Sequence, residues 1–267
     1  LALDIAARIE SLRASDANGS MASFDALSLD SAGFRVERIA DTATATGPLD
    51  IALDGLAATL ADAAGNAALR GDHIGLSLAP LTIAGGAAEA VDVAGDLDLA
   101  GIAVTRGGDV PLSLAIASSR TSFRDIRVAP LGADAALTGA IAAEIADLAL
   151  EAGAGAATAT FSARGIVNDA TAIRATGLAG DTPSFSATSR MKLSGLQAAF
   201  PVAAGVRAEA TLAEFAADLS AVEAAGAGVT AKGDLSASRL MATTDGETPD
   251  TLEIAAIALT GLDAGSD

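Results

Sequence analysis

Residues 91–104 read VDVAGDLDLAGIAV, and this stretch decides the fold that we expect for the whole chain. Its apolar residues fall at every second position up to Leu99, which is typical of a β-strand with one buried face. After Ala100 and Gly101 the alternation continues one position later, at Ile102. A shift of one position turns the apolar side chains to the other face unless the strand carries a bulge or turns a corner there. We therefore predict a kinked or bulged strand at Ala100-Gly101.

The same phrase recurs along the chain: an apolar residue, two small or charged residues, and a second apolar residue. Glycine at the step accepts unusual backbone angles, and aspartate can hydrogen-bond to its own backbone. The copies are Leu53-Asp54-Gly55-Leu56, Leu99-Ala100-Gly101-Ile102, Phe123-Arg124-Asp125-Ile126, Ile145-Ala146-Asp147-Leu148, Leu193-Ser194-Gly195-Leu196, Leu212-Ala213-Glu214-Phe215 and Leu259-Thr260-Gly261-Leu262, with weaker forms at Ile9-Glu10-Ser11-Leu12 and Val36-Glu37-Arg38-Ile39. This recurrence predicts an all-β protein, a long antiparallel meander of short bulged strands that forms a curved, partly open sheet or groove.

Three local signals set the expected ends of strands. Ser31-Ala32-Gly33 is typical of a turn between two strands, and Arg106-Gly107-Gly108-Asp109 is a stronger turn signal. Pro80 cannot donate a ladder hydrogen bond, so we place it at an edge or at an end of a strand.

In two segments the sequence pattern does not decide between helix and strand. Residues 1–14 alternate as in a strand, but Leu1, Ile5 and Ile9 also lie on one helical face. Residues 208–224 lack glycine, and alanine is the best helix former. Both segments contain a copy of the phrase, so the strand interpretation is favoured in each.

The chain has no linker rich in proline or serine and no run of like charges, so we expect one repetitive β-rich domain over residues 1–267. It begins at Leu1 with the pattern already established. We take it for a fragment of a longer chain, with a membrane anchor outside it as an option. The oligomeric state stays open.

The composition excludes some partners and chemistries. A formal charge of −18 argues against nucleic acid, which needs clustered Lys and Arg. Disulfides and thiol chemistry are excluded because the chain has no cysteine.

No motif points to a catalytic, cofactor or metal site, so we expect a protein that is not an enzyme. His73, the one histidine, precedes an alternating run and is expected at the surface or at a strand start. Ser189 and Lys192 match Ser-x-x-Lys, but the accompanying motifs of that enzyme class are absent. Asp96 and Asp98 share one strand face, where a solvated acidic face explains them better than a calcium site does.

The region from Gly205 to Asp263 carries a resemblance to a known group. Its Gly233-Asp234-Leu235 start and its Leu259-Thr260-Gly261-Leu262-Asp263 end resemble the repetitive β-rich domains of AsmA- and TamB-type bacterial envelope proteins, and of related alphaproteobacterial envelope domains of unknown function. The resemblance implies a periplasmic protein that is anchored or translocated through an N-terminal segment. It also implies a long curved sheet whose apolar groove carries or guides lipids.

We therefore expect a cell-envelope protein that takes part in lipid transfer or outer-membrane maintenance and binds lipid acyl chains. The alternative is a secreted or cell-surface structural β-repeat, such as an adhesin or a solenoid stalk. An enzyme with an unrecognised site is a third option. The residues expected to line the groove are Leu53, Leu97, Leu99, Leu112, Leu114, Ile145, Leu193 and Leu259.

Overall fold

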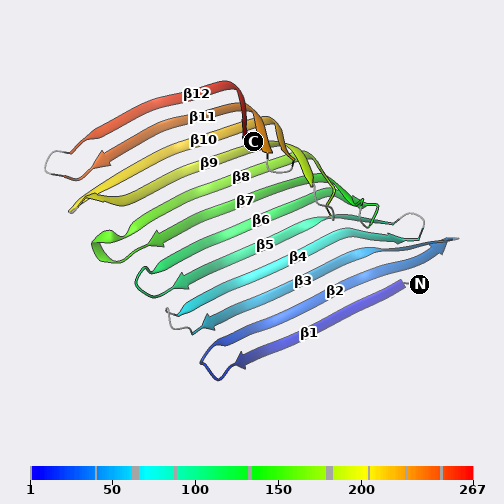
Figure 1. Ribbon diagram of the computed structural model, residues 1–267. Coiled ribbons are helices and arrows are strands. Elements are labelled where there is room, and N and C mark those ends of the chain that lie inside the picture. Colours follow the sequence, from blue (N-terminus) through cyan, green and yellow to red (C-terminus); the bar gives the residue numbers. More distant parts are fainter. Residues whose placement is uncertain are drawn as a thin grey trace.

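The computed structural model describes residues 2–266 apart from residues 40, 62–65, 87–88, 132–133, 179–182, 204, 226–227 and 247–248. The described residues form one antiparallel sheet of twelve strands, and each strand pairs with the strands before and after it in the sequence (Figure 1). β1 and β12 are the two edges of this sheet, and no contact joins their described residues. The prediction of an all-β antiparallel meander that forms a curved, open sheet is confirmed.

The bounds of the strands are β1 (Ala2–Ser15), β2 (Met21–Ile39), β3 (Thr42–Leu60), β4 (Ala67–Gly85), β5 (Ala90–Arg106), β6 (Leu112–Ala129), β7 (Ala136–Ala152), β8 (Ala159–Thr176), β9 (Ser184–Ala203), β10 (Val206–Ala225), β11 (Gly228–Thr244) and β12 (Thr251–Ser266). A short 3-10 helix, η1 (Gly155–Ala157), lies between β7 and β8. Both ambiguous segments are strands over their described residues, because residues 2–14 pair with β2 and residues 208–224 pair with β9 and β11.

The strands contain 14 to 20 residues, so the prediction of short strands is wrong. The chain continues through two places that were expected to end a strand. Ser31-Ala32-Gly33 lies inside β2, and Pro80 lies inside β4, which is an interior strand. In both places the strand is bulged, and a bulge interrupts the ladder where proline or an unusual glycine conformation is tolerated. The turn at Arg106-Gly107-Gly108-Asp109 is confirmed, since β5 ends at Arg106 and β6 begins at Leu112.

A line of left-handed residues crosses the whole sheet, and we call it the first seam. Each odd-numbered strand contributes one residue with a φ between 50° and 64°, and the facing residue belongs to an even-numbered strand. The left-handed residues are Ser11, Gly55, Gly101, Asp147, Gly195 and Arg239, and the facing residues are Asp25, Asp72, Ala117, Arg164, Ala213 and Ala255. Pairing resumes in the same register on both sides of the seam. Both strands therefore change parity together, and the apolar side chains stay on one face.

A second line of irregularity, the second seam, runs through the even-numbered strands. In each neighbouring pair the register shifts by one residue, and the extra residue belongs to the even-numbered strand. The extra residues lie at Ala32-Gly33, Ala79-Pro80, Arg124-Asp125, Thr171-Ala172, Ser220-Ala221 and Thr260-Gly261. Bulges bend a strand and increase its twist, which is consistent with the arched strands in Figure 1.

The recurring phrase therefore has two structural meanings. Most copies place their third residue in the first seam, whereas the copies that begin at Phe123 and Leu259 belong to the second seam. At the copies in the first seam the strand changes parity without a bulge, because the register does not shift there. The copy at Val36 pairs with β3 without interruption, so the prediction of a kinked or bulged strand is wrong there. The copy at Leu212 crosses the first seam at Ala213, on an even-numbered strand, with no left-handed residue of its own.

The sheet is a single layer over the described residues. Except for a small contact between η1 and β9, inter-element contacts join only strands that are consecutive in the sequence. Few described side chains are buried, and they are Ala90, Ile126, Ala135, Ala163, Ile173, Ala187 and Ala217, together with the polar Ser31. Because domains normally bury an apolar sheet face against a second layer, this sheet presents an unusual uncovered face.

Candidate functional site: the uncovered apolar face

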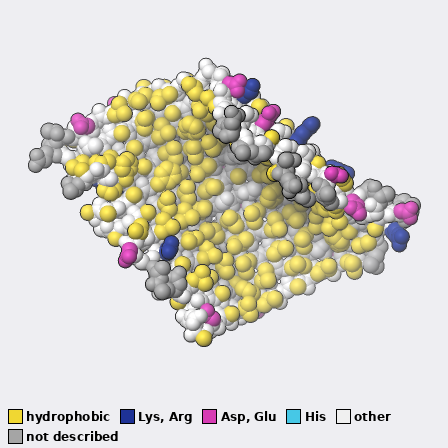
Figure 2. All heavy atoms as spheres, in the orientation of Figure 1, with side chains coloured by type: hydrophobic (Ala, Val, Ile, Leu, Met, Phe, Trp, Pro, Cys, Tyr) yellow, Lys and Arg dark blue, Asp and Glu magenta, His cyan; other side chains and the backbone are white. Residues whose placement is uncertain are grey.

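One face of the sheet is covered by apolar side chains. Figure 2 shows this face, with hydrophobic side chains spread over most of the visible surface and most charged side chains near its periphery. Side chains alternate along each strand, so every second side chain points to this face. Because paired strands change parity together at the first seam, the apolar side chains point to the same face on both sides of that seam. We call this surface the apolar face and the opposite surface the polar face.

The apolar face is built from rows of directly opposed residues that cross all twelve strands. One row, beside the first seam, is apolar at every position except Ser119. Its members are Ile9, Leu27, Leu53, Ile74, Leu99, Ser119, Ile145, Ile166, Leu193, Phe215, Ala237 and Ile257. Opposed side chains in antiparallel strands are in contact, so such a row is a continuous apolar strip.

All eight residues that were expected to line a groove lie on this face. Leu53, Leu99, Ile145 and Leu193 belong to the row just described. Leu97 and Leu259 lie in the next row, and Leu112 and Leu114 lie beyond the first seam. The structure thus brings these residues together on one surface, although they come from six different strands. Whether this surface holds a ligand stays a prediction.

Solvent reaches this face because nothing in the described structure lies over it. Ile9 and Ile257, at the two ends of the row, are 51% and 47% exposed, and Leu259 is 49% exposed. The inner members of the row are half-buried by their neighbours. Soluble proteins seldom expose a contiguous apolar patch larger than about 300–600 Å². A sheet of twelve strands, with strands of about 60 Å at 3.3 Å per residue, exceeds that size several-fold.

The polar face carries ion pairs between neighbouring strands. Arg120 Nη2 lies 2.7 Å from Asp96 Oδ2, and Asp98 Oδ1 is 3.7 Å from Arg120 Nε. The Arg120 guanidinium, with the Ser122 hydroxyl, holds the pKa of the Asp96 carboxyl below its usual value, and Asp96 in turn raises the pKa of Arg120. These two carboxylates therefore bind a guanidinium. Among the described residues no cluster of His, Asp or Glu suits a metal ion.

One ion pair on the polar face skips a strand. Arg124 of β6 lies 2.6 Å from Asp169 of β8, so the arginine side chain passes over β7. The residues of β7 beneath it are Ala140, opposite Arg124, and Ala142, opposite Asp169. Small side chains on β7 leave the room that this long-range pair needs.

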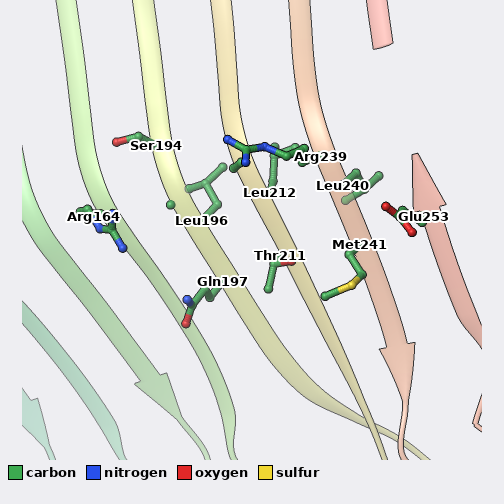
Figure 3. Close-up of a pocket in the computed structure, with 12 residues that line it drawn as sticks. Arg164, Ser194, Leu196, Gln197, Thr211, Leu212, Arg239, Leu240, Met241 and Glu253 are labelled. Atoms are coloured by element: carbon green, nitrogen blue, oxygen red, sulfur yellow. The ribbon is translucent and has the colours of Figure 1, made fainter. Parts of the chain in front are cut away.

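The polar face is hollowed over β8 to β12. A depression of about 540 Å³ is lined by Gln197, Thr211, Met241 and Glu253, with Arg164 at its margin. Figure 3 shows these side chains projecting from successive strands. The floor of the depression lies below these side chains because Gly195 and Ala213, which carry little or no side chain, lie between Arg164 and Arg239 in the first seam. The two arginines make no ion pair with another described residue.

The residues singled out for possible chemistry are not assembled into a catalytic group. His73 lies within β4 and not at a strand start, and its Nδ1 is 2.6 Å from Asp54 Oδ1 on β3. Ser189 and Lys192 project from opposite faces of β9, because they lie three positions apart along an extended strand. Ser189 Oγ donates to Asn168 Oδ1, and Lys192 pairs with Glu214. The Ser189 hydroxyl and the Lys192 amine are therefore not placed to act together as the Ser-x-x-Lys motif requires.

Comparison with known proteins adds no relative: no protein-family model, curated protein or solved structure matches the chain. In the part of the chain that the structure describes, no helix is both long and apolar enough to cross a membrane.

Local sequence reasoning missed most members of the apolar rows, including Ile74, Ile166 and Phe215. Each sits in an alternating run, but its place in a row depends on which residue it opposes in the next strand. The register of each strand pair can be predicted by counting residues outward from the hairpin that joins the two strands, and this count would have identified the opposed residues.

Proposed function

We propose that this protein is a non-enzymatic cell-envelope protein that binds lipid acyl chains on its apolar face and takes part in lipid transfer or membrane maintenance. The observation that carries the proposal is the uncovered apolar face, which crosses all twelve strands and stays on one side of the sheet. Envelope location rests on the resemblance of residues 205–263 to AsmA- and TamB-type domains.

The energetics of the face favour an occupant. Each buried CH₂ group contributes about 0.8 kcal/mol, and about half of the surface of residues such as Ile9 and Leu259 remains exposed. A hydrocarbon chain laid on the face removes water from both surfaces at once. This gain is large because many side chains share the same surface.

The chemistry of the side chains favours a flexible aliphatic ligand. The chain has seven Phe and no Trp or Tyr, so the face offers mainly branched aliphatic groups and alanine methyls. Aromatic ligands gain from ring stacking and from hydrogen bonds to Tyr and Trp, which this surface does not supply. Acyl chains need only a smooth apolar strip.

A structural β-repeat, such as a stalk or adhesin, is the competing function. A stalk gains rigidity from a filled interior between layers, whereas the described sheet has one layer. The single layer thus supports the lipid-binding proposal over the stalk.

The test is photocrosslinking from a defined face. A photoreactive benzophenone amino acid replaces Leu99 on the apolar face or, as a matched control, Asp98 on the polar face of the same strand. After irradiation in a bacterial envelope expression host, mass spectrometry identifies adducts. We expect phospholipid adducts at position 99 and few at position 98. Equal labelling at both positions, or a folded protein free of lipid, would contradict the proposal.

A further inference from the structure

We propose that the two edges of the sheet bind each other between copies of this chain, so that β12 of one copy pairs with β1 of the next and the sheet continues across the joint. This inference does not depend on lipid binding. It rests on the backbone edges, on the rows that end at them and on one pair of charges.

Both edges offer unpaired main-chain groups. Within the described sheet, β1 pairs only with β2, and β12 pairs only with β11. The two strands contain no proline, and β12 has only two charged residues, Glu253 and Asp263. Proteins usually protect edge strands with lysine, proline or short length, so these long edges are suited to strand addition. With an even number of strands, β1 of a following copy runs antiparallel to β12, as every other pair in the sheet does.

The rows of opposed residues fix the register of the joint. One row on the polar face begins at Arg13 and ends at Glu253 without a register shift. Its members are Arg13, Ser23, Ala57, Arg70, Ala103, Ala115, Ala149, Ser162, Gln197, Thr211, Met241 and Glu253. Continuing this row into a second copy places its Arg13 directly opposite Glu253.

The same register satisfies the neighbouring rows. It sets Ile257 opposite Ile9, the two ends of the apolar row, and Ile254 opposite Leu12. It also sets Ala255 opposite the left-handed Ser11. Left-handed residues on odd-numbered strands and facing residues on even-numbered strands therefore keep alternating along the first seam across the joint. The exposed edge residues Ile9, Leu12 and Ile257 would thereby gain the cover that inner members of their rows already have.

Charge complementarity selects this arrangement. Arg13 and Glu253 form no ion pair with any other described residue, whereas directly opposed pairs such as Arg127–Asp92 and Arg190–Asp218 occur inside the sheet. The joint would add one more pair of this kind. Because the two contacting surfaces differ, the assembly is head-to-tail and grows into open chains of copies or a ring.

The first experiment is sedimentation of the 267-residue chain over a range of concentrations. We expect species at multiples of 25.9 kDa that grow with concentration. Arg13→Glu puts like charges at the joint and is expected to weaken association roughly tenfold. Adding Glu253→Arg to that variant should restore it. The matched control Arg70→Glu makes the same charge change in an interior strand of the same row and should leave association unchanged.

The second experiment tests the register. The chain has no native cysteine, so a chain with Arg13→Cys is mixed with a chain carrying Glu253→Cys under oxidising conditions. Opposed Cα atoms in an antiparallel pair lie about 4.5–5.5 Å apart, within the range of a disulfide. We expect a mixed disulfide dimer. A folded protein that stays monomeric at high concentration, or Arg13→Cys chains that link only to each other, would overturn the proposal.

Discussion

The Asp72 carboxylate lies so close to Gly101, on the neighbouring strand, that a methyl group on Gly101 would overlap it. The two residues face each other across the first seam, where Gly101 has a φ of 61°. Glycine is therefore required twice, once for its backbone conformation and once for the space that Asp72 occupies. Asp25 covers Gly55 in the same way.

Replacing Gly101 with alanine is expected to lower the free energy of unfolding by roughly 2 kcal/mol, because a left-handed alanine costs about 1–2 kcal/mol and the overlap with Asp72 adds to it. In an Asp72→Ala background the cost should fall to about 1 kcal/mol. Urea denaturation followed by circular dichroism measures both. Gly85→Ala is the control, since φ is ordinary there and the nearest atom is 4.0 Å away. Equal costs of Gly101→Ala in both backgrounds would remove Asp72 from the explanation.

The Asp96–Arg120 pair predicts how stability depends on pH. The pKa of Asp96 is lower in the folded chain than the value of about 3.9 in an unfolded chain, so the unfolded chain binds more protons in this range. The contribution to stability is complete above the unfolded pKa and is lost as pH falls through the folded pKa. Between about pH 5 and pH 2, Asp96→Asn and Arg120→Gln should each lose stability less steeply than the unaltered protein. Denaturation midpoints at several pH values test this, and identical slopes in all three proteins would refute it.

Ser119 is the one polar residue in the apolar row that joins Leu99 to Ile145. If that row binds acyl chains, Ser119→Val should strengthen the binding of a fluorescent fatty acid by about threefold, since it adds apolar surface in the middle of the strip. The matched control is Ser118→Val, one residue away on the polar face. A similar gain from both variants would show that the fatty acid does not distinguish the two faces.

The Arg124–Asp169 pair should depend on the small side chains of β7 beneath it. Both partners are about half exposed, so we expect a coupling energy of only about 0.5 kcal/mol in a double-mutant cycle with alanine at each position. In an Ala142→Leu background the coupling should approach zero, because the larger side chain occupies the path of Arg124. Ala146→Leu, farther along the same face of β7, serves as the control. Coupling that survives Ala142→Leu would mean that the pair forms by another route.

The sequence by itself determined the strand content, the identity of the apolar face and the parity change at most copies of the phrase. These are local properties: side chains alternate along an extended chain, and a parity change at a step such as Ala100-Gly101 is visible in the order of the residues. The same local reasoning placed Leu53, Leu97, Leu99 and Leu193 on one surface.

Only the tertiary structure decided the length of the strands, the alignment of the left-handed residues and of the bulges into two separate seams, and the partners of each residue across the rows. Ser31-Ala32-Gly33 and Pro80 are typical of strand ends, yet β2 and β4 continue through them because neighbouring strands supply ladder hydrogen bonds on either side of the bulge. Register is a relation between two strands, so no single stretch of sequence contains it. For the same reason, the relation of Arg13 to Glu253 as opposite ends of one row became visible only in the assembled sheet.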